Sequence, residues 1–161
     1  MKPILAVLAT TLILGLAPTD RAAAEDGYKL ALKLTTKDAT HDPDGVWADD
    51  DLAGIRQAVG TAKIYTARIA TPSGTWLLSQ TNGDCNLQGM CTALLVLIRP
   101  GTPPVRLVRP VRPVRPVRMA NPQMPLGGTA ILSPDAKRLT TSEIAEDGKA
   151  FTGSYEVEPI Q

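Results

Sequence analysis

The clearest pattern of hydrophobic and polar positions lies over 28–36. Three leucines, Leu30, Leu32 and Leu34, alternate there with Lys29, Ala31 and Lys33. In an extended chain this alternation puts the leucines on one face. We therefore predict a strand over 28–36 with one buried face.

The next pattern has helical spacing. Four residues recur at that spacing, namely Leu52, Ile55, Arg56 and Val59. Asp49 or Asp50 can cap the first turn, because acidic side chains suit the positive end of a helix, and Gly60 can end it. The pattern predicts a short helix.

Two pairs of segments rich in strand-forming residues flank turn signals. The segments 63–71 and 75–80 are separated by Pro-Ser-Gly, and the segments 126–132 and 138–142 flank the turn residues Ser-Pro-Asp-Ala. Proline and glycine at these positions favour tight turns. Each pair therefore predicts a hairpin.

Two more segments complete the predicted strands. Residues 92–98 are almost continuously apolar, which favours a strand buried on both faces at the centre of the core. Residues 150–157 follow a turn at 146–149 and place four residues on one face, namely Phe151, Gly153, Tyr155 and Val157. With seven or so short strands and one helix, the predicted fold is mainly β, a small antiparallel β-sandwich or barrel.

The first 24 residues have the organisation of a signal peptide. Lys2 supplies a positive start, 4–17 are apolar, and Ala22-Ala23-Ala24 supplies the small residues required before the cut. A spanning helix needs about 20 apolar residues, more than this run holds. We predict cleavage near Ala24, a single β-rich domain over 25–161 without a transmembrane segment, and a periplasmic or secreted location.

Composition narrows the class of protein. A length of 161 residues suits one domain, and 43% hydrophobic with 20% charged residues is ordinary for a globular protein. Aromatic residues make up only 4%, so few rings are left to stack on sugars or bases. Without 1–24 the acidic and basic side chains balance, and no bulk charge draws the protein to nucleic acid. We expect no nucleic-acid partner.

The chain has two cysteines, Cys85 and Cys91. In an oxidising compartment an even number of cysteines this close together favours a disulfide over a metal or redox site. Five residues separate them, unlike the two of the thioredoxin-type motif. Because 83–91 is rich in turn-forming residues, we predict a bridge that clamps a loop between two strands.

The most distinctive segment is a Val-Arg-Pro repeat over 105–118, within a Pro- and Arg-rich loop predicted at 100–125. Proline lacks an N–H and pushes the preceding residue out of the helical region, so the repeat predicts a polyproline II insertion with three residues per turn. One stripe of that rod would hold five arginines: Arg106, Arg109, Arg112, Arg115 and Arg118.

Three interpretations of this arginine stripe stand side by side. The repeat is a neutral expansion of a loop, which costs little closure entropy. Alternatively it is a spacer or a docking segment for an aromatic-lined groove. In the third interpretation its guanidinium groups bind the phosphates of an anionic lipid or polysaccharide surface.

An acidic segment at 38–51 holds six aspartates around His41 and Trp47. Calcium prefers such oxygen ligands, and aligning Gly45 with the turn glycine of an EF-hand loop makes Asp42, Asp44 and Asp51 the candidate ligands. The sequence departs from that motif at the first and last ligand positions. A predicted strand also precedes the loop where the motif has a helix. The alternatives are a solvated turn that caps the helix and an acidic face that neutralises the arginine stripe. No other cofactor is predicted.

Residues for catalysis are poorly represented. His41 is the only histidine, and the Gly-x-Ser-x-Gly motif of serine hydrolases is missing from the sequence. We therefore predict a non-enzymatic, exported envelope protein that binds a protein or an anionic polymer. One alternative is an inhibitor of an envelope-directed hydrolase such as lysozyme, in which the 85–91 loop or the aspartate loop plugs the cleft of a cationic enzyme. The other is a calcium- or surface-binding module.

Overall fold

The computed structural model of the chain describes residues 27–98 and 117–157, with the backbone alone for 117–119. The predicted signal peptide and the repeat up to residue 116 lie outside these ranges. Within the described ranges, no helix is both long and apolar enough to cross a membrane.

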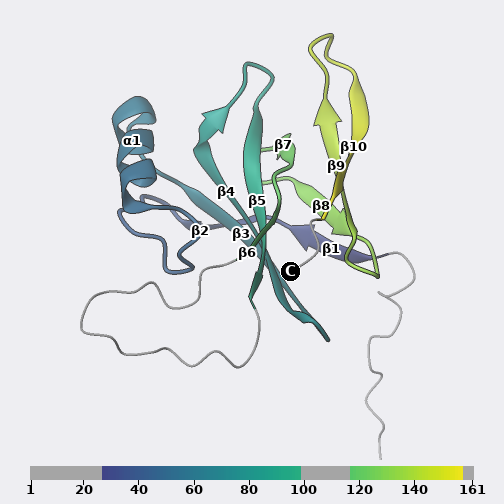
Figure 1. The fold of residues 1–161 in the computed structure, drawn as a ribbon. Helices are drawn as coiled ribbons and strands as arrows, with labels where there is room; N and C mark the ends of the chain where they lie inside the picture. The colour runs from purple at the N-terminus through teal and green to yellow at the C-terminus, as the bar shows by residue number, and fades with distance from the viewer. Residues whose placement is uncertain (1–26, 99–116, 158–161) are drawn as a thin grey trace, which may run out of the picture.

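The described residues form two antiparallel sheets and one helix (Figure 1). The first sheet has the order β1 (Tyr28–Ala31), β8 (Thr129–Leu132), β9 (Arg138–Ile144) and β10 (Ala150–Glu156). The second has the order β2 (Lys33–Thr36), β3 (Ile64–Thr71), β4 (Gly74–Cys85), β5 (Met90–Ile98) and β6 (Val117–Ala120), and β7 (Gln123–Pro125) also pairs with β5. The predicted mainly β fold is confirmed, and the sandwich is the architecture that fits.

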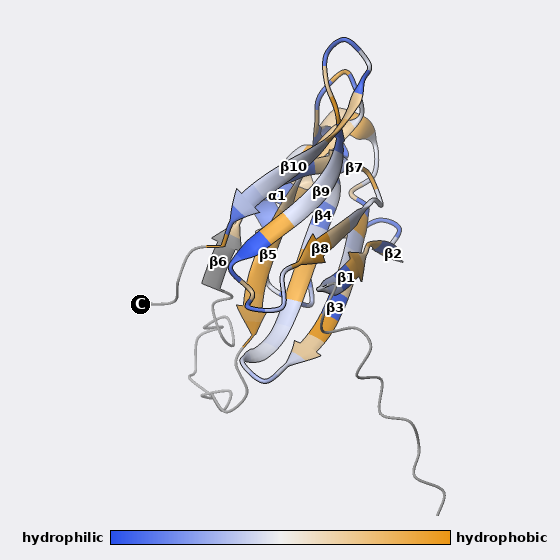
Figure 2. Ribbon diagram, turned by 90° about the vertical axis from the view of Figure 1, so that its right-hand side faces the viewer, coloured by the Kyte–Doolittle hydropathy of each residue, from blue (hydrophilic) through white to orange (hydrophobic). Residues whose placement is uncertain are grey.

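The hydrophobic core lies between the two sheets. Both sheets contribute to it, through the side chains of Leu30, Trp76, Leu78, Ala93, Leu95, Leu97, Ala130, Leu132 and Leu139. Figure 2 shows hydrophobic stretches on β5 and β8 in orange. The prediction that 92–98 is a central strand is confirmed, because β5 pairs with β4 on one side and with β6 and β7 on the other.

The segment 28–36 forms two strands in different sheets instead of the single strand predicted. The strands β1 and β2 pair with β8 and β3, and the chain changes sheet at Leu32, whose N–H donates to the carbonyl of Gly128 at 3.0 Å. Leu30 and Leu32 are buried, whereas Leu34 on the edge strand β2 is 42% exposed. An alternation with a period of two continues through such a crossing, so the pattern alone could not reveal it.

Two strands occupy the end of the predicted Pro- and Arg-rich loop. Arg118, the last residue of the predicted polyproline II segment, lies in β6 opposite Val96, and β7 follows at Gln123–Pro125. From Val117 to Ala120 every residue carries an N–H, so this stretch can pair with β5 where a proline-containing repeat cannot. The predicted extents, 100–125 for the loop and 105–118 for polyproline II, are therefore corrected from residue 117 onwards.

The predicted hairpins and the predicted helix are confirmed. The helix α1 (Asp49–Val59) is followed by Gly60 with φ of 85°, a conformation that favours glycine. Its N-terminus differs from the prediction, because Ala48 is the N-cap in place of Asp49 or Asp50. The Ala48 N–H donates to the carboxylate of Asp51 at 3.2 Å, which satisfies one of the free N–H groups at this end.

The helix α1 packs on the face of the second sheet that points away from the core. Leu52 is fully buried and forms a small cluster with Ile64 of β3. The Trp47 Nε1–H donates to the Ser79 hydroxyl of β4 at 2.9 Å. The close approach of α1 to β4 depends on Gly83, because a Cβ at this position would overlap the side chain of Ile55. These contacts fix the helix against β4.

A buried polar network joins the first sheet to β7. Glu143 is 8% exposed, and its Oε1 accepts hydrogen bonds from the Tyr155 hydroxyl at 2.6 Å and the Thr141 hydroxyl at 2.8 Å. The Gln123 N–H donates to the Tyr155 oxygen at 3.1 Å. Burial, and after it the hydrogen bond to Glu143, raise the pKa of Tyr155 above its ordinary value of 10.0.

Replacing Tyr155 with Phe is expected to reduce the amount by which the free energy of unfolding falls at alkaline pH. A hydroxyl with a pKa that is higher in the folded state stabilises fully below its unfolded pKa of 10.0, and this contribution is lost as pH rises through the folded pKa. At neutral pH the variant should lose about 1 kcal/mol with its hydrogen bonds. Urea unfolding at neutral and alkaline pH measures both effects. An equal alkaline loss in the two proteins would contradict this role.

Candidate functional site

The loop between Cys85 and Cys91 closes the β4–β5 hairpin at one end of the sandwich (Figure 1). The predicted disulfide is confirmed, and its cysteines occupy opposite positions of β4 and β5 with Cα atoms 3.9 Å apart. The five residues between them are therefore anchored to the sheet at both ends.

Asn86 stiffens this loop from inside. Its side-chain oxygen accepts hydrogen bonds from the N–H groups of Gln88 at 3.0 Å and Met90 at 2.9 Å. Its own N–H donates to the carbonyl of Met90 at 2.8 Å. Gly89 adopts φ of 74°, a conformation that glycine tolerates without strain. The loop is thus a hydrogen-bonded turn closed by a disulfide.

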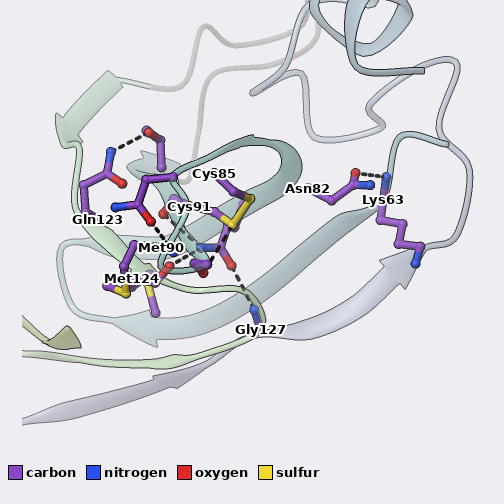
Figure 3. The surroundings of a disulfide bond; sticks show 12 residues. Lys63, Asn82, Cys85, Met90, Cys91, Gln123, Met124 and Gly127 are labelled. Atoms are coloured by element: carbon purple, nitrogen blue, oxygen red, sulfur yellow. Dashed lines mark hydrogen bonds between the residues drawn. A yellow bond between two sulfur atoms is a disulfide. The ribbon is translucent and has the colours of Figure 1, made fainter. Parts of the chain in front are cut away.

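Gln80 anchors the base of the hairpin, and its partners Cys91, Met124 and Gly127 are labelled in Figure 3. Its side chain is fully buried, and Nε2 donates to the carbonyls of Cys91 at 3.1 Å and Met124 at 3.0 Å. Its Oε1 accepts from the N–H of Gly127 at 2.9 Å. One side chain therefore ties β4 to β5, to β7 and to the turn that follows β7.

Leu87 projects from the closed loop into solvent. Its side chain is fully exposed, the highest exposure among the large hydrophobic residues that the structure describes. The β9–β10 hairpin ends at the same end of the molecule (Figure 1) and carries two further exposed residues, Ile144 at 39% and Phe151 at 48%. This end of the sandwich therefore presents apolar side chains on two hairpins.

A cleft of about 750 Å³ lies between α1 and the outer face of β4 and β5. Its wall on the sheet side includes Leu94 and Val96, and its wall on the helix side includes Gly54 and Ile55, with Trp47 before the helix. Three carboxylates also line it, those of Asp50, Asp51 and Asp84. The cleft combines apolar walls with negative charge.

The hydroxyl of Thr81 lies in the wall of this cleft without a partner. Thr81 is 1% exposed, and its Oγ1 forms no hydrogen bond in the structure. The neighbouring hydroxyls are satisfied, since Ser79 accepts from Trp47 and Thr92 accepts from the Gln123 side chain at 2.7 Å. A buried hydroxyl without a partner costs stability, so Thr81 stands out on this face.

The predicted calcium ligands are engaged by groups of the protein itself. The Asp42 carboxylate is buried and accepts hydrogen bonds from three backbone N–H groups. Asp44 pairs with Arg68, and Asp51 accepts from the N–H of Ala48. Over the described ranges, no group of three or more His, Cys, Asp or Glu side chains is placed to hold a metal ion. The calcium site stays a prediction.

Of the remaining sequence candidates, His41 is not among the residues that line the cleft, and most of the repeat's arginines lie outside the described ranges. Arg106, Arg109, Arg112 and Arg115 fall within 99–116, outside those ranges, and Arg118 is placed by its backbone in β6. His41 forms an exposed pair with Asp49, with Nδ1 and Oδ1 3.0 Å apart.

Sequence reasoning missed the cleft and the exposure of Leu87. Two isolated glycines offered a signal for the cleft, because Gly54 interrupts a helix and Gly83 interrupts a strand. Such a glycine often marks a close approach of two parts of the structure. For Leu87 the only signal in the sequence was a leucine among turn-forming residues.

Comparisons of the chain with protein-family models, with curated proteins and with solved structures yield no match.

Proposed function

We propose that the protein is an exported, non-enzymatic envelope protein that binds a protein partner through the loop between Cys85 and Cys91. The observation that carries this proposal is the fully exposed Leu87 on a loop closed by a disulfide. The disulfide is compatible with the oxidising compartment that the predicted signal peptide implies.

The energetics favour this loop as the anchor. Burying a leucine side chain in a partner contributes about 1.5–3 kcal/mol. A loop already ordered by the disulfide and by Asn86 loses little conformational entropy on binding, so more of that contribution appears as affinity. Ile144 and Phe151 at the same end can widen the apolar contact.

A narrower form of the proposal is inhibition of an envelope-directed hydrolase such as lysozyme. A stiff loop with one protruding apolar side chain suits insertion into an enzyme cleft. Residual lytic activity of a lysozyme, measured with increasing amounts of the protein, tests this form. The wild type should inhibit, whereas a Leu87→Asp variant should not.

Replacing Leu87 with Asp is expected to weaken partner binding about thirtyfold, which corresponds to about 2 kcal/mol. Capture from an envelope extract identifies proteins held by the wild type and lost with Leu87→Asp. Affinity is then measured with the purified partner. The matched control is Val59→Asp, which changes a 51% exposed residue at the end of α1.

Two results would contradict the proposal. In the first, Leu87→Asp captures the same proteins with the same affinity. In the second, capture is lost when Arg106, Arg109, Arg112, Arg115 and Arg118 are all replaced with Gln, while Leu87→Asp has no effect. The repeat would then be the binding element, for a protein or for an anionic polymer.

A further inference from the structure

We propose that the cleft between α1 and the second sheet binds a basic side chain, arginine or lysine, of a polypeptide partner. The cleft is a different surface from the Cys85–Cys91 loop. It combines an unpartnered hydroxyl, three carboxylates and an opening in the wall formed by the helix.

The Thr81 hydroxyl is the first observation. It lies on the face of β4 that is turned toward α1, like Ser79, which accepts from Trp47. It is 99% buried and has no partner, unlike the hydroxyls of Ser79 and Thr92 on the same face. An N–H group of a ligand that enters the cleft supplies the missing donor.

The charge of the cleft is the second observation. Asp50, Asp51 and Asp84 line it, and no lysine, arginine or histidine does so among the residues whose side chains the structure describes. None of these three takes part in an ion pair between described residues. Arg118, which is placed by its backbone alone, pairs with Val96 of the cleft wall. Three carboxylates around one cleft favour a cationic ligand, most strongly where apolar walls lower the local dielectric constant.

The shape of the cleft is the third observation. A Cβ at Gly54 meets nothing within 4 Å, so the absent side chain leaves open space in the helix wall. Glycine inside a helix costs about 0.5–1 kcal/mol relative to alanine. The walls formed by Trp47, Leu94 and Val96 suit the aliphatic stem of a long basic side chain.

A peptide with one arginine tests the proposal. The probe is the acetylated and amidated peptide Gly-Val-Leu-Arg-Val-Leu-Gly, titrated by calorimetry into the mature protein. The same peptide with neutral citrulline is the comparison, because it differs from arginine by the charge and little in shape. We expect the citrulline peptide to bind about tenfold more weakly, and the arginine peptide to weaken at high ionic strength.

Variants of the protein locate the binding. Gly54→Trp fills the cleft from the helix and should abolish binding, while Ala53→Trp adds the same bulk on an exposed position outside the lining and should not. Asp50→Asn and Asp84→Asn should each weaken the arginine peptide, with Asp147→Asn at a distant turn as the charge control.

Thr81→Val separates a ligand-binding role from a structural one. Valine has the shape of threonine but no hydroxyl, so the variant should melt at the same or a higher temperature while the peptide binds more weakly. If the Thr81 hydroxyl instead stabilises the fold, its removal lowers the melting temperature.

Three results would overturn the proposal. Equal affinity for the arginine and citrulline peptides rules out a site for a cation. Unchanged binding by Gly54→Trp places the peptide elsewhere. Failure of the arginine peptide to bind either the wild type or a variant with the five arginines from Arg106 to Arg118 replaced by Gln shows that the cleft takes no basic side chain. A Leu87→Asp variant with unchanged peptide binding keeps this test separate from the proposed function.

Discussion

Replacing Gln80 with Met is expected to lower the free energy of unfolding by about 3 kcal/mol. Methionine has nearly the shape of glutamine but cannot form the three hydrogen bonds that the Gln80 side chain makes. The carbonyls of Cys91 and Met124 and the N–H of Gly127 would then lack this partner. Because Gln80 is fully buried, water cannot replace the lost bonds without opening the base of the hairpin.

Urea unfolding followed by circular dichroism measures this loss. The matched control is Gln57→Met on the exposed surface of α1, which should change stability by less than about 0.5 kcal/mol. A loss in Gln80→Met no greater than in the control would mean that the buried side chain does not hold β4, β5 and β7 together. Hydrogen exchange at Gly127 provides a local readout, because its N–H should exchange faster in the variant.

Gln80 also illustrates what the sequence could not reveal. Its partner Gly127 lies 47 residues further along the chain, and no local pattern indicates that pairing. The same holds for the change of sheet at Leu32, which depends on pairing with β8 and β3. The cleft likewise requires α1 and β5 to be placed against one another.

Features controlled by neighbouring residues were predictable. The Pro-Ser-Gly turn between β3 and β4 and the glycine after α1 restrict the local backbone directly. Cys85 and Cys91 were close enough in sequence for the disulfide to follow from spacing and compartment. Of the candidate sites, the sequence identified the disulfide loop and the aspartate loop but neither Leu87 nor Thr81 as the residue of interest.

Asp42 carries the second large expected effect. The sequence marks it as a candidate calcium ligand, yet in the structure its carboxylate accepts from the N–H groups of Asp44 at 3.0 Å, Val46 at 2.8 Å and Trp47 at 3.0 Å. These bonds shape the loop that positions Trp47 over Ser79. Asp42→Ala should therefore lower the free energy of unfolding by about 3 kcal/mol.

Asp42→Asn should lose about half as much stability as Asp42→Ala, because the amide keeps one acceptor oxygen. Asp50→Asn is the control, since no hydrogen bond from a described residue to its exposed carboxylate is present. Melting curves with and without calcium separate the two roles of Asp42. If Asp42 is a calcium ligand, calcium raises the melting temperature of the wild type but not that of Asp42→Ala. A carboxylate that only orders the loop leaves both melting temperatures independent of calcium and keeps the full difference between them.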